Sequence, residues 1–223
     1  MNLALFDLDG TLIPKDSDHA FGEFAITLGW VDAASFRRRN DGFYEDYLAG
    51  RLDIDAYVDF ATAPWRHRSE GELQRATERF LEIVVKPMLQ PQALALVQRH
   101  QQASDLVAVV TATNEFVTRP IARLFGVDEL IATNLARAAD GGVTGRIEGV
   151  PSFREGKITR VQAWLAARGQ AMSDFQRTHF YSDSTNDLPL LECVSNPVAT
   201  NPSPELERIA LARGWPVLKL FSP

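Results

Sequence analysis

The feature of this sequence that most limits its fold is a change of pattern near residue 88. From there onwards, segments with helical periodicity alternate with short apolar runs, which is typical of parallel strands joined by helices. One more apolar run, Leu3–Phe6, stands alone near the N-terminus and stops at Asp7. Because short continuous apolar runs are typical of strands buried on both faces, we assign Leu3–Phe6 to the same sheet. The pattern predicts an α/β fold built on a doubly wound parallel sheet.

The expected elements after residue 88 follow from periodicity and from turn residues. Helices are expected at 91–102, 114–125, 154–168, 186–192 and 204–212. Strands are expected at 106–111, 129–132, 178–182, 196–199 and 216–220. Residues 133–149 are expected to form a β-hairpin that turns at Asp140-Gly141-Gly142, because Asp-Gly pairs favour tight hairpin turns.

The segment between the first strand and the alternating region has helical periodicity throughout. Four helices are expected there, at 17–29, 32–49, 53–62 and 69–85. A connection of roughly 70 residues is far longer than the usual crossover between strands. We therefore predict a core domain made of residues 1–15 and 88–223, interrupted by a helical cap domain at 16–87.

The composition excludes several classes of function. The 223 residues include 23 lysines and arginines against 29 aspartates and glutamates, a net charge of −6, so an extended nucleic-acid surface is not expected. No stretch approaches the ~20 apolar residues of a membrane span. Residues 1–10 lack the basic start and long apolar stretch of a secretory signal, and the one cysteine, Cys193, can form no internal disulfide. We expect a cytoplasmic protein that binds neither nucleic acid nor membrane, with Cys193 buried.

Two carboxylates, Asp7 and Asp9, follow the first strand directly. Residues two apart in an extended chain point to the same side, so both can face one cleft beyond the end of the strand. Two acids in one cleft can divide acid and base work when their environments differ. An ordinary Asp-Gly turn at a strand end is the alternative for this motif alone.

A second acidic cluster, Asp183 and Asp187, follows the strand expected at 178–182. A helix N-terminus accounts for one aspartate there through its dipole, but not for a second cluster of acids at another strand end. Four aspartates in one crevice repel each other unless a cation lies among them. Their hard oxygen ligands favour Mg²⁺, although Mn²⁺ accepts a similar set.

Two further positions carry groups that bind anions. Thr111 and Ala112 end an apolar strand just before a helix begins, where a hydroxyl and free backbone N–H groups can hold an anion. Lys157 stands near the start of an expected helix and can supply a cation. Taken alone, the Thr111–Ala112 stretch is most simply a helix cap, and Lys157 is most simply a solvated surface lysine. Together with the acids they lie in order at strand ends or helix starts, which favours one site.

These motifs resemble the haloacid dehalogenase superfamily of phosphatases over nearly the whole chain. The resemblance rests on Asp7-Leu-Asp-Gly-Thr11, Thr111, Lys157 and Asp183-Ser-Thr-Asn-Asp187. It implies a Rossmann-like core, and the helical insertion after the first motif is similar to the C1 cap of the branch that contains phosphoserine phosphatase. The family's chemistry would be hydrolysis of a phosphate monoester that needs Mg²⁺ and passes through an aspartyl-phosphate.

The resemblance also implies a role for each motif residue. Asp7 would attack phosphorus, and Asp9 would protonate the leaving alcohol and then activate water. The phosphoryl group would be held by Thr111, Ala112, Lys157 and Asn186. The metal would be bound by Asp7, Asp9 through its backbone carbonyl, Asp183 and Asp187. Asn186 and Asp187 would also support the metal and the lysine.

The start of the expected cap bears on the substrate. Asp16, Asp18 and His19 are candidate specificity residues, because two acids suit a cationic group on a small phosphate ester. The stretch Asp16–Phe24 and Tyr47-Leu-Ala-Gly50 are similar to bacterial members of this branch assigned as histidinol-phosphatases, so histidinol phosphate is the first expectation. Capping of the helix at 17–29 is the simpler role for these acids.

Phosphoserine hydrolysis and phosphoryl transfer by a mutase are the alternative functions. The protein is expected to be a monomer or a homodimer.

Overall fold

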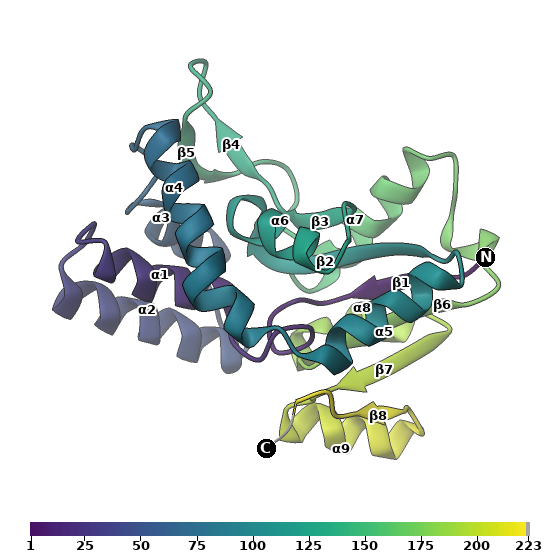
Figure 1. Cartoon of the computed structure of the whole chain (residues 1–223). Coiled ribbons are helices and arrows are strands. Elements are labelled where there is room, and N and C mark those ends of the chain that lie inside the picture. Colours follow the sequence, from purple (N-terminus) through teal and green to yellow (C-terminus); the bar gives the residue numbers. More distant parts are fainter. Residues whose placement is uncertain (222–223) are drawn as a thin grey trace.

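The computed structural model describes residues 1–221, and its main feature is a six-stranded parallel sheet (Figure 1). The strand order is β3-β2-β1-β6-β7-β8. The strands are β1 (Leu3–Phe6), β2 (Leu106–Asn114), β3 (Leu130–Thr133), β6 (Thr178–Ser182), β7 (Asn196–Thr200) and β8 (Val217–Leu218). From β1 the chain builds outward to β3, then returns to the other side of β1 at β6. The predicted doubly wound sheet is confirmed, and its topological switch point lies between β1 and β6.

Helices cover both faces of this sheet. The helices that follow residue 88 are α5 (Pro91–Gln102), α6 (Glu115–Leu124), α7 (Glu155–Ala166), α8 (Leu188–Cys193) and α9 (Pro204–Arg213). Ala4 and Phe6 of β1 pack with residues of α5 and α6, whereas Leu3 and Leu5 pack with α7, α8 and α9. All four residues of β1 are buried, since the strand is central and covered on both sides. This explains why its sequence is an unbroken apolar run.

Four helices lie between β1 and α5, gathered at one end of the sheet in Figure 1. They are α1 (Ser17–Thr27), α2 (Ala33–Leu48), α3 (Ile54–Thr62) and α4 (Glu70–Phe80). Each begins after a residue whose side chain accepts a backbone N–H of the first turn, Asp16, Asp32, Asp53 and Ser69. These caps explain why the four predicted helix starts agree closely with the structure. The division into a core and a cap domain remains a prediction, since Phe21 and Phe80 belong to the same buried cluster as Phe6.

Some elements differ from the sequence prediction in their ends. The helix expected at 69–85 gives way to a π turn at Leu81–Val85 and a 3₁₀ turn at Lys86–Met88, where Pro87 cannot continue the α-helical pattern. Short 3₁₀ turns also occur at Met172–Asp174 and Thr185–Asp187. The expected hairpin is present as β4 (Leu135–Arg137) and β5 (Val143–Ile147), and β5 packs against α3.

Two further predictions concern exposure. Cys193 is exposed, so the expectation of a buried cysteine was wrong; it is the last residue of the short helix α8. Within residues 1–221, no single helix has the length and apolar character of a membrane span, although Glu70–Met88 and Pro91–Gln102, bent by 97°, pass that test of length and composition as a pair.

Candidate active site

The residues predicted from three separate motifs come together at the switch point of the sheet. Asp7 follows β1 and donates its backbone N–H to the Tyr181 carbonyl of β6, at 2.9 Å. Asp183 follows β6, the parallel neighbour of β1. Thr111 lies in the last part of β2, where the pairing with β3 shifts register between Val110 and Asn114. β2 therefore runs three residues beyond the predicted end at 111, and the irregularity sits beside the site, as bulges often do.

A buried lysine joins two of the aspartates. Lys157 Nζ lies 2.8 Å from Asp7 Oδ1 and 2.7 Å from Asp187 Oδ2, and the three side chains are almost completely buried. Asp187 also accepts the Ser182 hydroxyl at 2.7 Å. Burial opposes the charge on Lys157, but the two carboxylates outweigh it and raise the pKa of the ammonium above its ordinary value. Lys157 is therefore a fixed cation beside Asp7.

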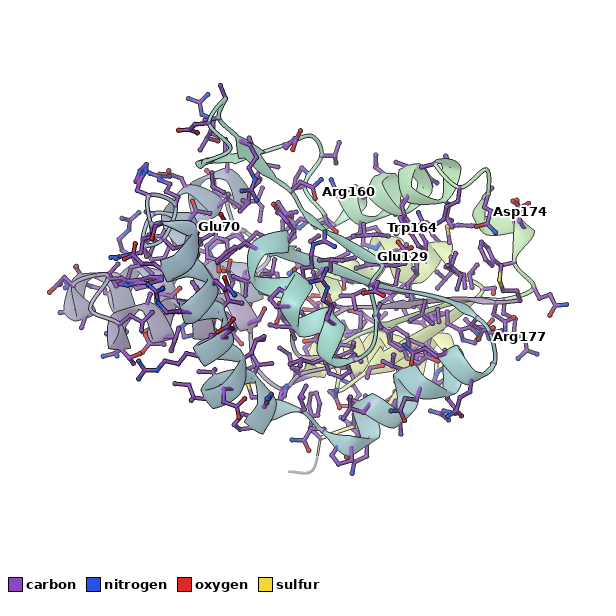
Figure 2. The ribbon with its side chains drawn as sticks, turned by 45° about the horizontal axis from the view of Figure 1, so that its top comes forward. Glu70, Glu129, Arg160, Trp164, Asp174 and Arg177 are labelled. Atoms are coloured by element: carbon purple, nitrogen blue, oxygen red, sulfur yellow. The ribbon has the colours of Figure 1, made fainter. Side chains whose placement is uncertain are left out.

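Helix α7 is anchored so that Lys157 reaches Asp7. Trp164 Nε1 donates to Glu129 at 2.9 Å, and Arg160 donates to Asn134 at 2.9 Å; Figure 2 shows Trp164 pointing toward Glu129 across the layer between α7 and β3. These contacts fix the helix against the edge of the sheet. The rotation of α7 then directs Lys157 inward, on the side of the helix that also carries Val161.

Thr11 and Gly10 shape the space between Asp7 and Asp183. The Thr11 hydroxyl lies 3.2 Å from Asp7 Oδ2 and 3.2 Å from Asp183 Oδ1. Gly10 has φ of +76°, and a Cβ there would stand 2.3 Å from Asp183 Oδ2. Both the left-handed backbone and the close approach require glycine at this position. The two carboxylates consequently share one small polar space.

Asp9 is held by two hydrogen bonds from different elements. The Ser17 N–H at the start of α1 donates to Oδ1 at 2.8 Å, and the Thr113 hydroxyl donates to Oδ2 at 3.0 Å. Burial, followed by the charges of Asp16 and Asp7, raises the pKa of Asp9 well above its ordinary value. This shift favours the protonated carboxyl, which is the form that a general acid needs. Burial likewise raises the pKa of Asp7 to about 6, although Lys157 lowers it.

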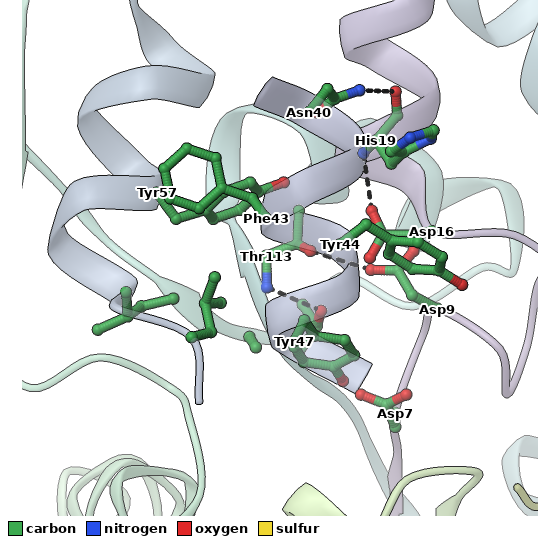
Figure 3. A pocket seen from close by; sticks show the side chains of 14 residues that line it. Asp7, Asp9, Asp16, His19, Asn40, Phe43, Tyr44, Tyr47, Tyr57 and Thr113 are labelled. Atoms are coloured by element: carbon green, nitrogen blue, oxygen red, sulfur yellow. Dashed lines mark hydrogen bonds between the residues drawn. The ribbon is translucent and has the colours of Figure 1, made fainter. Parts of the chain in front are cut away.

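A pocket with a cavity volume of about 30 Å³ lies above these aspartates (Figure 3). Its wall on the cap side is largely aromatic, with Tyr44 and Tyr47 from α2 and Tyr57 from α3. Asp16 lies beside Asp9 in this pocket. The complete lining consists of Asp7, Asp9, Asp16, His19, Asn40, Phe43, Tyr44, Tyr47, Leu52, Ile54, Tyr57, Thr111, Ala112 and Thr113.

Most of the residues predicted from sequence line this pocket or contact Asp7 directly. Asp187 contacts Lys157, as the resemblance implied, and Asn186 contacts helix α2. The Asn186 amide donates to the Tyr47 carbonyl at 3.1 Å, and Asp187 binds Lys157 and Ser182. These contacts favour positioning roles for both, whereas their assignment to the phosphate and the metal remains a prediction.

Asp18 lies behind the pocket wall and not in it. It is 5% exposed, and both of its carboxylate oxygens lie 3.3 Å from Asn114 Nδ2. Burial and the nearby Asp16 raise the pKa of Asp18 to about 7, against hydrogen bonds from Tyr57 and Asn114 that lower it. The geometry indicates that Asp18 supports Tyr57 and the end of β2 and has no direct place in the pocket lining.

This burial predicts a pH dependence of stability. Because the folded state holds the proton of Asp18 up to about pH 7, wild-type stability falls as the pH rises from about 4 to about 7. Asp18→Asn lacks this loss, so its free energy of unfolding relative to wild type should rise by about 2–4 kcal/mol between pH 4 and pH 8. Denaturant unfolding at both pH values measures the difference.

Asp32→Asn is the matched control for this experiment. Hydrogen bonds from the Ser35 backbone and side chain lower the pKa of Asp32, so Asp32 is ionised in the folded and the unfolded protein above about pH 4, and the stability of that variant relative to wild type should hardly change between pH 4 and pH 8. If the free energy of unfolding of Asp18→Asn changed with pH in the same way as that of wild type, Asp18 would titrate as an exposed carboxylate.

Several site residues were not found by sequence reasoning. Thr113, Tyr47 and Tyr57 line the pocket, and Thr113 contacts Asp9. Thr113 carried a signal, because it is the second hydroxyl in the stretch that ends β2, two residues after Thr111. Tyr47 belongs to a stretch quoted for the resemblance, and Tyr57 carried no signal. An aromatic residue on one of these helices has the same sequence pattern whether it packs inside the helical region or faces the pocket.

Comparisons with known proteins agree with this geometry. The model of the haloacid dehalogenase-like hydrolase family matches residues 4–192. A histidinol-phosphatase of Neisseria meningitidis serogroup C (strain 8013) is 49% identical over 217 residues, covering 97% of this chain and 98% of the relative. A solved structure of a protein of unknown function from Bordetella pertussis Tohama I is 52% identical, covers 99% of both chains and has a TM-score of 0.93.

A more distant structure extends the likeness of the fold. A phospho-aspartyl intermediate analogue of phosphoserine phosphatase has a TM-score of 0.67 at 18% identity and covers 98% of this chain and 93% of its own. The family model spans β1 to α8 and thus all the strand ends that carry the clustered aspartates. The chain belongs to the haloacid dehalogenase-like hydrolases.

Proposed function

We propose that this haloacid dehalogenase-like phosphatase hydrolyses histidinol phosphate. The observation that carries the proposal is the lining of the pocket, which within residues 1–221 combines aspartates and aromatic rings and contains no lysine or arginine. Histidinol phosphate has an ammonium group and an imidazole ring but no carboxylate. Asp16 suits the ammonium, and the rings of Tyr44, Tyr47 and Tyr57 suit a cation or a flat heterocycle. The name of the Neisseria relative agrees with this substrate.

The reaction proposed follows from the places of Asp7 and Asp9. Asp7 attacks phosphorus while Lys157 neutralises charge on the phosphoryl oxygens, and the ester oxygen leaves with the proton of Asp9. Asp9, now ionised, takes a proton from water as the water attacks the aspartyl-phosphate, which returns Asp7 and releases phosphate. We assign the binding of phosphoryl oxygens to Thr111 and Ala112, which line the same pocket as Asp7. Phosphoryl transfer depends mainly on such positioning and charge neutralisation.

The acids around Gly10 also fit a divalent cation, and we propose Mg²⁺. Asp7 and Asp183 converge on Thr11, and Asp183 forms no ion pair with a basic side chain of the described residues. Burial and the charges of Asp7 and Asp187 raise the pKa of Asp183 well above its ordinary value, which marks an uncompensated carboxylate. No group of three acids or histidines in residues 1–221 is already arranged as a metal cage, which agrees with an ion that uses one or two carboxylates and water. When bound, the metal would supply positive charge to the phosphoryl group.

Metal binding should therefore stabilise the fold. Adding Mg²⁺ to protein freed of metal with a chelator is expected to raise the melting temperature by a few degrees at ten or more times the Kd. Asp183→Asn should remove this increase while keeping the fold, because the substitution removes a half-buried charge that no basic side chain of the described residues compensates. A melting temperature that rises equally in wild type and in Asp183→Asn would place the metal elsewhere.

Phosphoserine and phosphoryl acceptors other than water are the alternative substrates. The carboxylate of phosphoserine would meet Asp16 in a pocket whose lining, within residues 1–221, contains no lysine or arginine, which disfavours it. A mutase would use the same Asp7 chemistry but pass the phosphoryl group to a sugar hydroxyl. Formation of the aspartyl-phosphate without phosphate release from any ester would favour the mutase.

The test is phosphate release from histidinol phosphate, phosphoserine, sugar phosphates and p-nitrophenyl phosphate by wild type and Asp16→Asn. Histidinol phosphate should be the preferred substrate, and Asp16→Asn should raise its KM about 10- to 100-fold, the effect of losing a charged partner. The KM for p-nitrophenyl phosphate, which has no ammonium group, should change little. Asp32→Asn is the matched control, since Asp32 caps α2 as Asp16 caps α1 but does not line the pocket. Equal effects on both esters would leave Asp16 with a capping role alone.

A further inference from the structure

Arg154 and Asn186, which lie outside the four helices between β1 and α5, contact the C-terminal end of helix α2. The Arg154 guanidinium donates to the Gly50 carbonyl, and Arg154 Nε lies 3.4 Å from Asn186 Oδ1. Asn186 in turn donates to the Tyr47 carbonyl at 3.1 Å. The C-terminus of a helix is the negative end of its dipole, and the last turn of α2 contains no basic residue. Arg154 supplies that positive charge from another part of the chain.

The backbone at Arg154 is strained. It has φ of 50° and ψ of −124°, a region that residues other than glycine rarely occupy. Strained residues of this kind persist where surrounding contacts hold them, and they cluster at functional sites. Gly50, with φ of +67°, permits the approach, because a Cβ there would lie 3.2 Å from Arg154 Nη2. The contact thus joins a strained backbone at Arg154 to a left-handed backbone at Gly50.

The same two residues are adjacent to the groups that surround Asp7. Arg154 precedes helix α7, whose third residue is Lys157, and Asn186 precedes Asp187, the second partner of Lys157. On the other side of the contact, the Tyr47 ring forms part of the pocket wall above Asp7 (Figure 3). The contact therefore connects the wall that covers the substrate with the cation that neutralises charge on the phosphoryl oxygens.

We propose that Arg154, together with Asn186, is a latch. It holds helix α2 over the active site and fixes the position of Tyr47 relative to Lys157. Arg154 is in this view a positioning residue and does not touch the substrate. The inference rests on the proposed phosphatase chemistry at Asp7 but not on the identity of the ester.

The experiment compares Arg154→Met and Arg154→Gly with wild type. Arg154→Met removes the guanidinium at nearly constant length, and Arg154→Gly removes it while relieving the backbone strain, so that at least this variant should fold normally. Both should lower kcat/KM for p-nitrophenyl phosphate about 10- to 100-fold, the effect of losing a charged hydrogen bond. Hydrogen exchange of backbone amides in residues 46–52 should become faster in both. Arg154→Lys, which keeps the charge, should lie between wild type and Arg154→Met.

Arg51→Met is the matched control, because Arg51 follows Gly50 but is exposed and pairs only with Asp46 among the described residues. It should change neither kinetics nor exchange in residues 46–52. Wild-type kinetics or wild-type exchange in Arg154→Gly would overturn the latch. A wild-type enzyme that prefers another ester over histidinol phosphate would contradict the substrate assignment alone, because the latch is measured with p-nitrophenyl phosphate.

Discussion

Replacing Asp7 with asparagine is expected to lower kcat by about 10⁴-fold or more, the scale seen when a covalent nucleophile is removed. An amide has no negative charge with which to attack phosphorus. The substitution leaves Lys157 paired with Asp187 at 2.7 Å, and Asp183 Oδ1 remains an acceptor for the Thr11 hydroxyl at 3.2 Å. Residual phosphate release measured with p-nitrophenyl phosphate at saturating metal gives the size of the effect.

The same variant should retain its fold. Burial and the charge of Asp187 raise the pKa of Asp7, which means that the ionised carboxylate costs free energy in the folded protein. Asp7 also raises the pKa of Asp183. Without metal, Asp7→Asn should therefore unfold at the same temperature as wild type or a higher one. Turnover above about one hundredth of wild type in a folded variant would assign the nucleophile to another residue.

Much of the fold could be predicted because its signals are local. The apolar run Leu3–Phe6 identifies a central strand, and cap residues such as Asp32 and Ser69 mark helix starts, so both types of element were placed within a few residues. Element ends were less predictable, since Pro87 altered the last turns of one helix and tertiary pairing extended β2 to Asn114. Cys193 was misplaced because composition describes how cysteines behave on average, whereas its exposure depends on how α8 is turned.

The aspartates and Lys157 could be predicted for a different reason. Each stands at the end of a strand or the start of a helix, and the topology of a parallel sheet brings such positions together whatever lies between them. Tyr47, Arg154 and Asn186 meet only because helix α2 packs over the sheet. No local pattern reports a contact between a carbonyl on one helix and a side chain about 140 residues away. Contacts between the cap region and the sheet had to come from the structure.

Replacing Lys157 with methionine should impair both catalysis and stability. The ammonium is 1% exposed and is the shared partner of two buried carboxylates, Asp7 at 2.8 Å and Asp187 at 2.7 Å. Breaking a buried ion pair from one side leaves uncompensated charge and typically costs about 3–5 kcal/mol. We expect a loss of that size in the free energy of unfolding without metal. We also expect turnover to fall at least about 10²-fold, because one of the charges that offsets the phosphoryl group is gone.

A double variant separates loss of charge balance from loss of packing. Methionine fills much of the volume of lysine, so most of the destabilisation in Lys157→Met should come from the unpaired carboxylates. Adding Asp187→Asn removes one of them, and Lys157→Met/Asp187→Asn should therefore be more stable than Lys157→Met alone, measured by denaturant unfolding. Turnover should not recover with stability, because the double variant still lacks the cation beside Asp7. Equal stability of the single and double variants would mean that Lys157 acts mainly through packing, and recovery of turnover would mean that its charge has no part in the reaction.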